Sequence, residues 1–516
     1  MRPSIVIAAV VVLGFAVGGG YYGLEVFPQR RFRAGLDQAL ATLPPGTTAT
    51  YKSAHYSVLL RQAVVTGLAV HGEIPGDPPQ PFDVVIDSIE TTNPNLGFPD
   101  LWAHAVANPA SFAPDTALPV ADAVAIKGAI VRSAAFNLTE ASVQLAKLRL
   151  YPWALLHDGM PSWREIQASL KPGSQPPELA DLRPIFRAEA AAILGFAYDS
   201  YAAGAANIRE ALPGIDVEYD IREMTGDAFD RGVMRGASLR GITLNDNVVG
   251  ALAIDRVAMG AVDVREPMTR LIFGDALSAS LLNGISIGRI EYSGITARPP
   301  GQPTIHVTGF SLGPVAFADG MPVSGELGWT DVRVSKLQVP DPRVWDAFNQ
   351  LGLETITVSF TLAYDWDVAH QRVSIHDTML KVDELGTLTV SADLTNIVPN
   401  AAGMDQGSLA HLRLRLEDAS LVDRLLRMGA ASSGADPAAY RALIVGMLRQ
   451  QPTGAGQGTM IAAAARAAGD FITSPQSLTI ELSPPAPIPF IALRGAMMSP
   501  VNLATMPGLT VSANEP

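Results

Sequence analysis

The chain has 516 residues, of which 37 are Lys or Arg and 50 are Asp or Glu, so its formal net charge is −13 at pH 7. An acidic chain repels phosphate backbones, and no basic patch stands out, so we expect no nucleic-acid partner. Apolar residues make up 48% of the chain, which excludes a largely disordered protein. The absence of cysteine excludes disulfide frameworks, thiolate metal sites and cysteine nucleophiles.

The N-terminal residues 1–27 carry the strongest local signal. The stretch from Ile5 to Leu24 contains no charged residue and is long enough, as a helix, to span the ~30 Å hydrocarbon core of a bilayer. Tyr21 and Tyr22 stand at one end, where aromatic side chains meet the membrane interface. We therefore expect a single-pass anchor in the bacterial inner membrane, with the bulk of the chain in the periplasm.

Two features keep alternatives to this topology open. Ala16-Val17-Gly18 has the small-x-small pattern of a cleaved secretory signal. Arg30, Arg31 and Arg33 follow the apolar stretch, and by the positive-inside rule alone they would keep the body in the cytoplasm. We favour export, because so short an N-terminal tail is typical of a signal-like anchor.

Residues 28–175 are predicted to form a β-rich region with a short leading helix. Over residues 28–43, Phe32, Leu36 and Leu40 recur at helical spacing. Short apolar runs broken by turns follow, up to a polar, Pro-rich stretch. Residues 176–215 are expected to be a helical segment, with apolar residues recurring on one face from about Pro184 to Leu212.

Residues 216–400 are the most informative part of the chain, because short strands punctuated by glycine recur there. From Ile356 to Val368 apolar residues alternate with mostly polar ones, which predicts a strand with one apolar face. Two further strands are expected, about 371–382 and 387–397. The pattern predicts an elongated, curved antiparallel sheet.

Residues 401–516 are predicted to be a helical region with a final strand, Ser477–Leu482. Three stretches have helical periodicity, and the second begins with Asp436 as N-cap before Pro437. The expected fold class is therefore mainly β with helical additions (α+β), preceded by one transmembrane helix.

No motif in the sequence predicts a catalytic, cofactor or metal site. The eight histidines have no metal-ligand spacing. Gly309-Phe310-Ser311-Leu312-Gly313 matches a nucleophile elbow in letters, but a helix should follow and another strand-like run does. Asp365 and Asp367 could be paired carboxylates on one strand, although exposed acids on a polar sheet face are the commoner explanation. We expect a non-enzymatic protein without a cofactor.

The apolar face of the predicted strand at 356–368 must be covered by something. The ordinary explanation is a second sheet or a layer of helices. The functional one is a groove in which acyl chains replace core side chains, lined by Ile356, Val358, Phe360 and Leu362. Burial of each CH₂ contributes about 0.8 kcal/mol, so such a groove needs no polar motif.

The chain resembles AsmA-like bacterial envelope proteins in the repetitive sequence pattern of residues 1–400. The resemblance lies in the N-terminal anchor and in glycine-punctuated strands such as LRGITL (239–244), ISIGRIEYSGI (285–295) and DELGTLTVSADLTNI (383–397). It implies an anchored periplasmic protein whose groove-forming sheet serves phospholipid movement or outer-membrane maintenance. The helical C-terminal region departs from this pattern.

The expected function is binding or transfer of lipids in maintenance of the cell envelope. Its partners would be the inner membrane and phospholipid or another apolar envelope component. One alternative is a scaffold or assembly subunit that docks an envelope protein through its strand edges and has no ligand. A second alternative is a hydrolase whose active site is assembled from distant segments.

Overall fold

A computed structural model describes most of the chain after residue 45. The described residues are 29, 32–34, 36–37, 40, 46–58, 60–74, 80–95, 97–133, 136–156, 183–212, 215–246, 250–274, 278–318, 320–335, 346, 349–398, 406–450, 457–497 and 506–515. The predicted membrane anchor, residues 1–27, lies outside them. Among the residues that are described, no helix combines the length and apolar character needed to cross a membrane.

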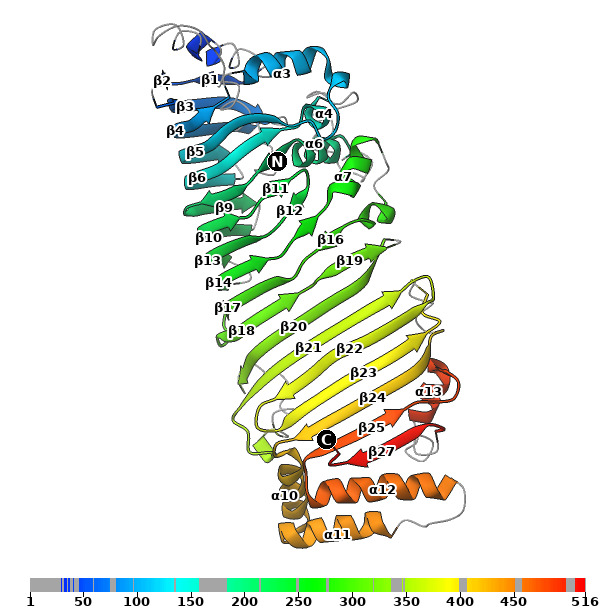
Figure 1. Cartoon of the computed structure of the whole chain (residues 1–516). Helices are drawn as coiled ribbons and strands as arrows, with labels where there is room; N and C mark the ends of the chain where they lie inside the picture. Colours follow the sequence, from blue (N-terminus) through cyan, green and yellow to red (C-terminus); the bar gives the residue numbers. More distant parts are fainter. Residues whose placement is uncertain are drawn as a thin grey trace. The chain divides into compact units, whose positions relative to one another are not determined.

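The chain divides into two compact units, Met1–Ile290 (unit 1) and Glu291–Pro516 (unit 2). The division falls inside the region 216–400 that the sequence pattern presents as continuous. In both units antiparallel strands predominate and helices are added to them, which confirms the predicted mainly β class with helical additions (Figure 1).

Unit 1 begins with antiparallel strands, of which β3 to β6 are long and lie side by side in chain order (Figure 1). Their bounds are β1 Thr48–Thr50, β2 Ser53–Ser57, β3 Gln62–Ile74, β4 Gln80–Pro94, β5 Leu118–Ser133 and β6 Phe136–Leu150. Between β4 and β5 lie helix α3 (Phe98–Ala107) and the short 3₁₀ helix η1 (Pro109–Ser111).

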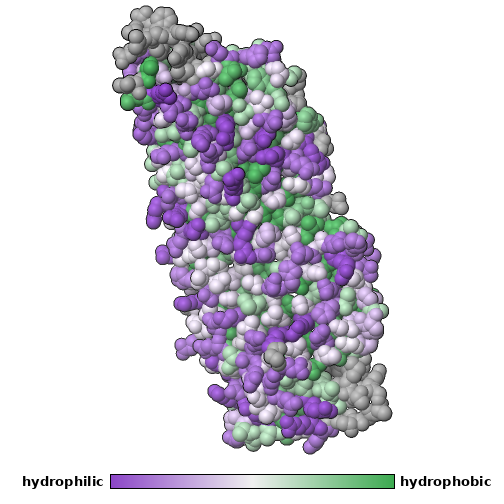
Figure 2. Space-filling model, in the orientation of Figure 1, coloured by the Kyte–Doolittle hydropathy of each residue, from purple (hydrophilic) through white to green (hydrophobic). Residues whose placement is uncertain are grey.

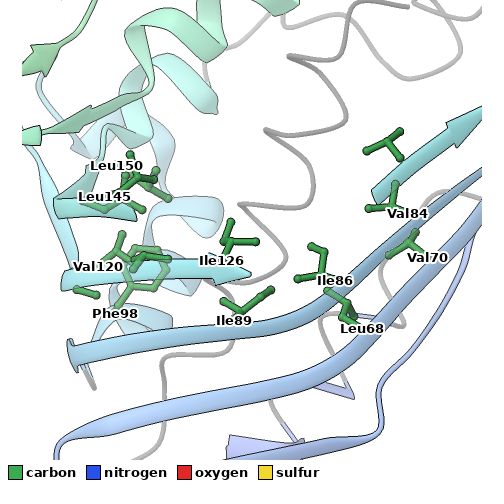
Figure 3. Packing of buried hydrophobic residues seen from close by; sticks show 14 of the residues in the cluster. Leu68, Val70, Val84, Ile86, Ile89, Phe98, Val120, Ile126, Leu145 and Leu150 are labelled. Carbon is green, nitrogen blue, oxygen red and sulfur yellow. The ribbon is translucent and has the colours of Figure 1, made fainter. Parts of the chain in front are cut away.

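The main core of unit 1 is built on one face of these strands. Leu68 of β3, Ile86 of β4 and Ile126 of β5 are all nearly inaccessible to solvent, and Phe98 of α3 joins the same cluster. Figure 3 shows side chains of this cluster gathered beside the strands. Because alternate residues of a strand point to opposite faces, the apolar alternation in β3 to β5 places a full set of aliphatic side chains here.

The predicted leading helix is supported where residues are described. Positions 29, 32–34, 36–37 and 40 are helical. Phe32 and Leu36 are buried against Ala54, Tyr56 and Val65 of the first strands. The helical spacing of the apolar residues therefore marks the face that packs on β2 and β3.

The helix predicted from about Pro184 to Leu212 is wrong in its second half. Helix α6 ends at Leu194 (Arg183–Leu194), and three strands follow: β7 Phe196–Tyr198, β8 Ser200–Ala203 and β9 Ala206–Leu212. All three pair with β6, so the backbone groups of this segment are satisfied by the sheet. The apolar residues of the segment fit a helical period by coincidence, and Gly195 marks the actual end of the helix.

The rest of unit 1 continues the antiparallel pattern through paired strands and one helix. The strands are β10 Ile215–Gly226, β11 Phe229–Asp230, β12 Val233–Met234, β13 Ala237–Asp246, β14 Gly250–Met259, β15 Val262–Asp263 and β16 Ser286–Ile287. Helices α4 (Pro152–Leu155), α6 and α7 (Arg265–Ile272) form a small separate core with the 3₁₀ helix η2 (Ala279–Leu282).

Unit 2 contains the strands predicted most clearly. The strands are β17 Ile290–Arg298, β18 Ile305–Leu312, β19 Val315–Ala318, β20 Met321–Ser335, β21 Thr355–Asp367, β22 Arg372–Val382 and β23 Gly386–Thr395. From β20 onward these long strands pair in chain order, as an antiparallel meander. The strand expected at 356–368 and its two successors are thus confirmed to within two residues at each end.

The C-terminal region contains more strand than its sequence pattern predicts. Strand β24 (Ser408–Asp418) precedes helices α10 (Leu421–Ser433), α11 (Pro437–Arg449) and α12 (Gln457–Thr473). After them come β25 Ser477–Leu482, β26 Ile488–Pro489, helix α13 (Phe490–Met497) and β27 Leu509–Ala513. The predicted region 401–516 is therefore a continuation of the sheet from which helices project, because β24 pairs with both β23 and β25.

Candidate functional site

One face of the sheet in unit 2 carries a continuous row of large apolar side chains. The register pairs Phe310 of β18 with Trp329 of β20, Trp329 with Phe360 of β21, and Phe360 with Leu380 of β22. Directly opposed residues of antiparallel strands point to the same face. The row therefore crosses four neighbouring strands without a polar interruption.

The aromatic members of the row contact one another. The rings of Trp329 and Phe360 are stacked with their centroids 4.5 Å apart. The ring centroids of Tyr292 and Phe310 are 5.6 Å apart and the rings are tilted. Contacts of this kind contribute about 0.5–1.5 kcal/mol each beyond the burial of area, and they fix the side chains in place.

A second, shorter row lies on the same face, where Leu312, Leu327 and Leu362 are register partners in turn. We call the two rows together the apolar strip. Its members are Tyr292, Phe310, Leu312, Leu327, Trp329, Phe360, Leu362 and Leu380.

The apolar strip is not covered in the way that a core is. Leu312 is 41% exposed and Leu380 is 39% exposed. The other members are half-buried. Among the described residues, no buried hydrophobic cluster includes a member of the strip. A row of large apolar side chains that is only partly covered is more typical of an interaction site than of a neutral surface.

The far end of the same face, at β24 to β27, is covered. Leu409 and Leu482 are buried beneath Phe490 and Leu493 of α13. Helices α10 and α12 bury Leu426 and Phe471 in a neighbouring cluster with Leu416 and Leu478. The helices thus cover one part of this face. Over the apolar strip, no described helix forms a buried cluster with the sheet.

A bulge in β20 keeps its apolar residues in phase with β21. The register shifts between Trp329 and Val332, and Asp331 has a positive φ of 51°. Ser359 of β21 fills the bulge: its Oγ accepts a hydrogen bond from the Asp331 backbone N–H at 3.0 Å. The extra residue on one strand restores the alternation, so Trp329 and Val332 both face the apolar side.

Gly325 makes room for an aromatic ring at the edge of the strip. Gly325 is the register partner of Tyr364. A Cβ atom at Gly325 would lie 2.9 Å from Cε1 of Tyr364, which is closer than side chains approach in folded proteins. The glycine therefore lets the Tyr364 ring lie across β20, and burial raises the pKa of the Tyr364 hydroxyl.

The four predicted groove residues lie on one face of β21, as the alternation required. Phe360 and Leu362 belong to the apolar strip. Val358 is half-buried and pairs with Val332 and Val382. Ile356 is only 6% exposed, so it belongs to the packed end of the strand and not to the exposed strip.

The partners of Phe360 on other strands were not among the predicted groove residues. Tyr292, Phe310 and Trp329 come from three strands that precede β21 in the chain. Each stands at an apolar position of an alternating run, and that was a usable signal. The register that aligns them depends on the bulge at Asp331, which no local pattern reveals.

The opposite face of the sheet is polar, and the two aspartates considered as paired carboxylates lie there, each paired with a histidine. Asp365 Oδ2 is 2.8 Å from His376 Nε2, and Asp367 Oδ2 is 2.6 Å from His370 Nδ1. These are exposed ion pairs on a strand and its turn, and not two acids facing one substrate. Hydrophilic residues recur over the face of the molecule drawn in Figure 2, with paler and hydrophobic residues between them.

The pKa of one member of each pair is shifted. The hydrogen bond from His370 holds the pKa of Asp367 below its usual range. The hydrogen bond to Asp365 raises the pKa of His376, against a smaller opposing effect of burial. Hydrogen bonding to a charged group favours its charged form, which accounts for the direction of both shifts.

The formal nucleophile-elbow motif lacks the required geometry. Gly309, Phe310 and Ser311 lie within β18, and Gly313 is followed by β19 (Val315–Ala318). The motif needs a strand that turns sharply into a helix. Ser311 is therefore a sheet residue, and Phe310 and Leu312 of the same motif belong to the apolar strip.

Within the described ranges, no group of three or more His, Asp or Glu side chains is placed to hold a metal ion.

Comparisons with known proteins add one match. A family model described as "Uncharacterized protein" matches residues 379–514, which correspond to the last part of β22, the covered end of unit 2 and its helices. No curated protein and no solved structure matches the chain.

Proposed function

We propose that this chain is a non-enzymatic, membrane-anchored protein of the bacterial periplasm that binds or transfers lipids through the apolar strip of unit 2. The observation that carries the proposal is the strip itself: eight large apolar side chains on one sheet face, outside every described buried cluster.

The energetics favour an acyl chain as the occupant. A face of this kind offers no polar group for orienting a small polar substrate, whereas each buried CH₂ contributes about 0.8 kcal/mol. Several methylene groups laid along the strip would supply enough free energy for firm binding. The half-buried aromatic rings of Trp329 and Phe360, which are stacked on each other, would supply part of such contacts.

The proposed cellular location of the protein rests on its sequence. The uncharged stretch from Ile5 to Leu24 supports an inner-membrane anchor. The resemblance to AsmA-like envelope proteins supports a periplasmic body concerned with phospholipid movement. The inner-membrane anchor, the periplasmic location of the body and the lipid ligand are therefore all parts of the proposal.

The test is native mass spectrometry and solvent extraction of the full chain, expressed in bacteria and purified in a detergent with an uncharged sugar head group. We expect discrete adducts of phospholipid mass. Phe360→Asp places a charge in the middle of the apolar strip and should abolish the adducts, because an acyl chain cannot solvate a carboxylate.

Thr389→Asp is the matched control. Thr389 is exposed on the polar face of β23 and is the register partner of Met379, the residue before Leu380 on β22. This variant should keep its adducts. A wild-type chain without adducts, or equal adduct loss in both folded variants, would refute lipid binding by the strip and favour a scaffold, which cross-linking to a partner protein would then identify.

A further inference from the structure

Unit 1 contains a cavity of about 540 Å³ that the proposed function does not use. Three arginines line it, Arg149, Arg235 and Arg265, together with two carboxylates, Asp199 and Asp230. The arginines come from separate elements: β6, the residue after β12, and the start of α7. Three guanidinium groups converging in a chain of net charge −13 call for an explanation.

The two carboxylates do not neutralise the arginines fully, because cations outside the lining share them. Asp199 lies 2.9 Å from Arg149 Nη2 and also 3.3 Å from Lys147 Nζ. Asp230 accepts hydrogen bonds from the Tyr151 hydroxyl at 2.8 Å and from Arg231 Nε at 3.3 Å. The cavity wall therefore keeps an excess of positive charge.

Donor capacity also remains unused at the cavity. Nε of Arg149 is shut off from solvent and has no hydrogen-bond acceptor among the described residues. The side chain of Arg235 is exposed and forms no hydrogen bond or ion pair with any residue that the structure describes. The guanidinium of Arg235, which is both exposed and without a described partner, is therefore available to donate hydrogen bonds to a ligand.

The third arginine is held in position by the backbone. Arg265 Nη2 donates to the carbonyl of Asp230 at 3.0 Å, and its Nε donates to the carbonyl of Arg231 at 3.2 Å. Gly232, with a φ of +81°, allows this close approach, because a Cβ there would lie 3.3 Å from Cα of Arg265. A guanidinium fixed in this way loses little entropy when it binds an anion.

We infer that this cavity is a binding site for a phosphate group. Guanidinium groups match the geometry of phosphate oxygens and bind them through paired, charge-assisted hydrogen bonds. The volume lies within the range of small-molecule sites and accommodates a phosphate ester. The phosphate could be that of a lipid head group or of a soluble metabolite. The inference stands independently of lipid binding by the apolar strip, since all of its residues belong to unit 1.

The test is isothermal titration calorimetry on the full chain in an uncharged sugar-based detergent, with two probes: glycerol 3-phosphate and short-chain phosphatidic acid. Arg235→Gln should weaken binding about tenfold, because it removes a hydrogen bond between charged groups without disturbing a described contact. The control is Arg132→Gln, an exposed arginine of β5 outside the cavity, which should leave binding unchanged.

The two probes distinguish the sources of the phosphate. Binding of both probes, with dependence on Arg235, supports a site for soluble phosphate esters. Binding of the lipid alone, with the same dependence, supports a head-group site. Binding of neither probe, or binding that Arg235→Gln and Arg149→Gln leave unchanged, would overturn the inference. Circular dichroism of each variant establishes that it is folded.

Discussion

The two units contain strands with the same alternating pattern, but the apolar face is buried in unit 1 and partly exposed along the apolar strip in unit 2. In unit 1, Ile86 is 1% exposed and Val84 is 2% exposed, within a cluster that runs across β3 to β6. In unit 2, Leu380 occupies an equivalent inward-alternating position on β22 and is 39% exposed. Alternation therefore predicts which face of a strand is apolar, but not whether that face becomes a core.

The proposed lipid binding is assigned to the unit whose apolar face is left partly exposed. A closed face contributes stability, and substitutions there should destabilise the fold. An exposed face contributes little stability, so its large apolar residues need another reason to be there. The following predictions, ordered from the largest expected effect to the smallest, test this contrast.

The largest effect is expected from truncation in the closed face. Ile86→Ala should lower the local stability of β3 to β5 by about 2–5 kcal/mol, because it leaves a cavity in a packed core. Leu380→Ala should cost about 1 kcal/mol or less, because the side chain is already partly solvated. Hydrogen–deuterium exchange of peptides from the two units measures both effects. Equal losses at the two positions would remove the distinction.

Glu140 should make the closed face sensitive to pH. It is 6% exposed on β6, and burial raises its pKa from 4.5 to about 7. Each pKa unit corresponds to about 1.36 kcal/mol. Because the folded pKa is the higher one, the contribution of Glu140 to the stability of unit 1 should be most favourable below pH 4.5 and should fall by about 3 kcal/mol as the pH rises from 4.5 to 7.

Glu140→Gln should remove this loss, since the amide is neutral at every pH. Urea unfolding of the wild type and the variant across this pH range, followed through exchange in unit 1, measures the difference. Parallel pH profiles for the two proteins would show that Glu140 is not the group responsible.

A smaller effect is expected at the helical cover of unit 2. Asp436 Oδ2 accepts hydrogen bonds from the backbone N–H groups of Ala438 and Ala439, at 3.0 and 3.1 Å. Asp436→Ala should cost about 1 kcal/mol and increase exchange in the first turn of α11. Asp436→Asn should restore most of the loss, because asparagine also caps helices. Failure of that rescue would point to charge instead of capping.

The smallest effect is expected on the polar face. The pKa of His376 is raised by Asp365, so the pair contributes stability below pH 6.5, which is lost as the pH rises through the folded-state pKa. Both side chains are well exposed, so His376→Asn should cost less than about 1 kcal/mol at acid pH and nothing at alkaline pH. Unfolding at two pH values checks this, and a cost that persists at alkaline pH would contradict it.

Local patterns predicted the elements whose period is unambiguous. The seven alternating apolar residues from Ile356 to Val368 gave strand β21, and Asp436 before Pro437 gave the start of α11. The helix predicted for the segment after Leu194 is wrong because its apolar residues happen to recur at helical spacing, whereas pairing with β6 decides its structure. That pairing joins residues about 70 positions apart and leaves no local trace.

The candidate site was predictable only along a single strand. Phe360 and Leu362 follow from the alternation in β21, but their neighbours Phe310 and Trp329 depend on the register between strands. The arginines of the cavity in unit 1 are separated by more than a hundred residues between Arg149 and Arg265. Neither their approach nor the excess of positive charge could be read from a chain that is acidic as a whole.

The most direct test of whether the apolar strip is open to a ligand uses the absence of cysteine from the chain, since each introduced cysteine becomes a unique labelling site. Leu380→Cys and Val84→Cys are prepared in the full chain, stripped of lipid in a sugar-based detergent and treated with a maleimide. We expect rapid labelling at position 380, slow labelling at position 84, and protection of position 380 alone by short-chain phospholipid. Slow labelling at both positions, or labelling at 380 that phospholipid leaves unchanged, would contradict the account.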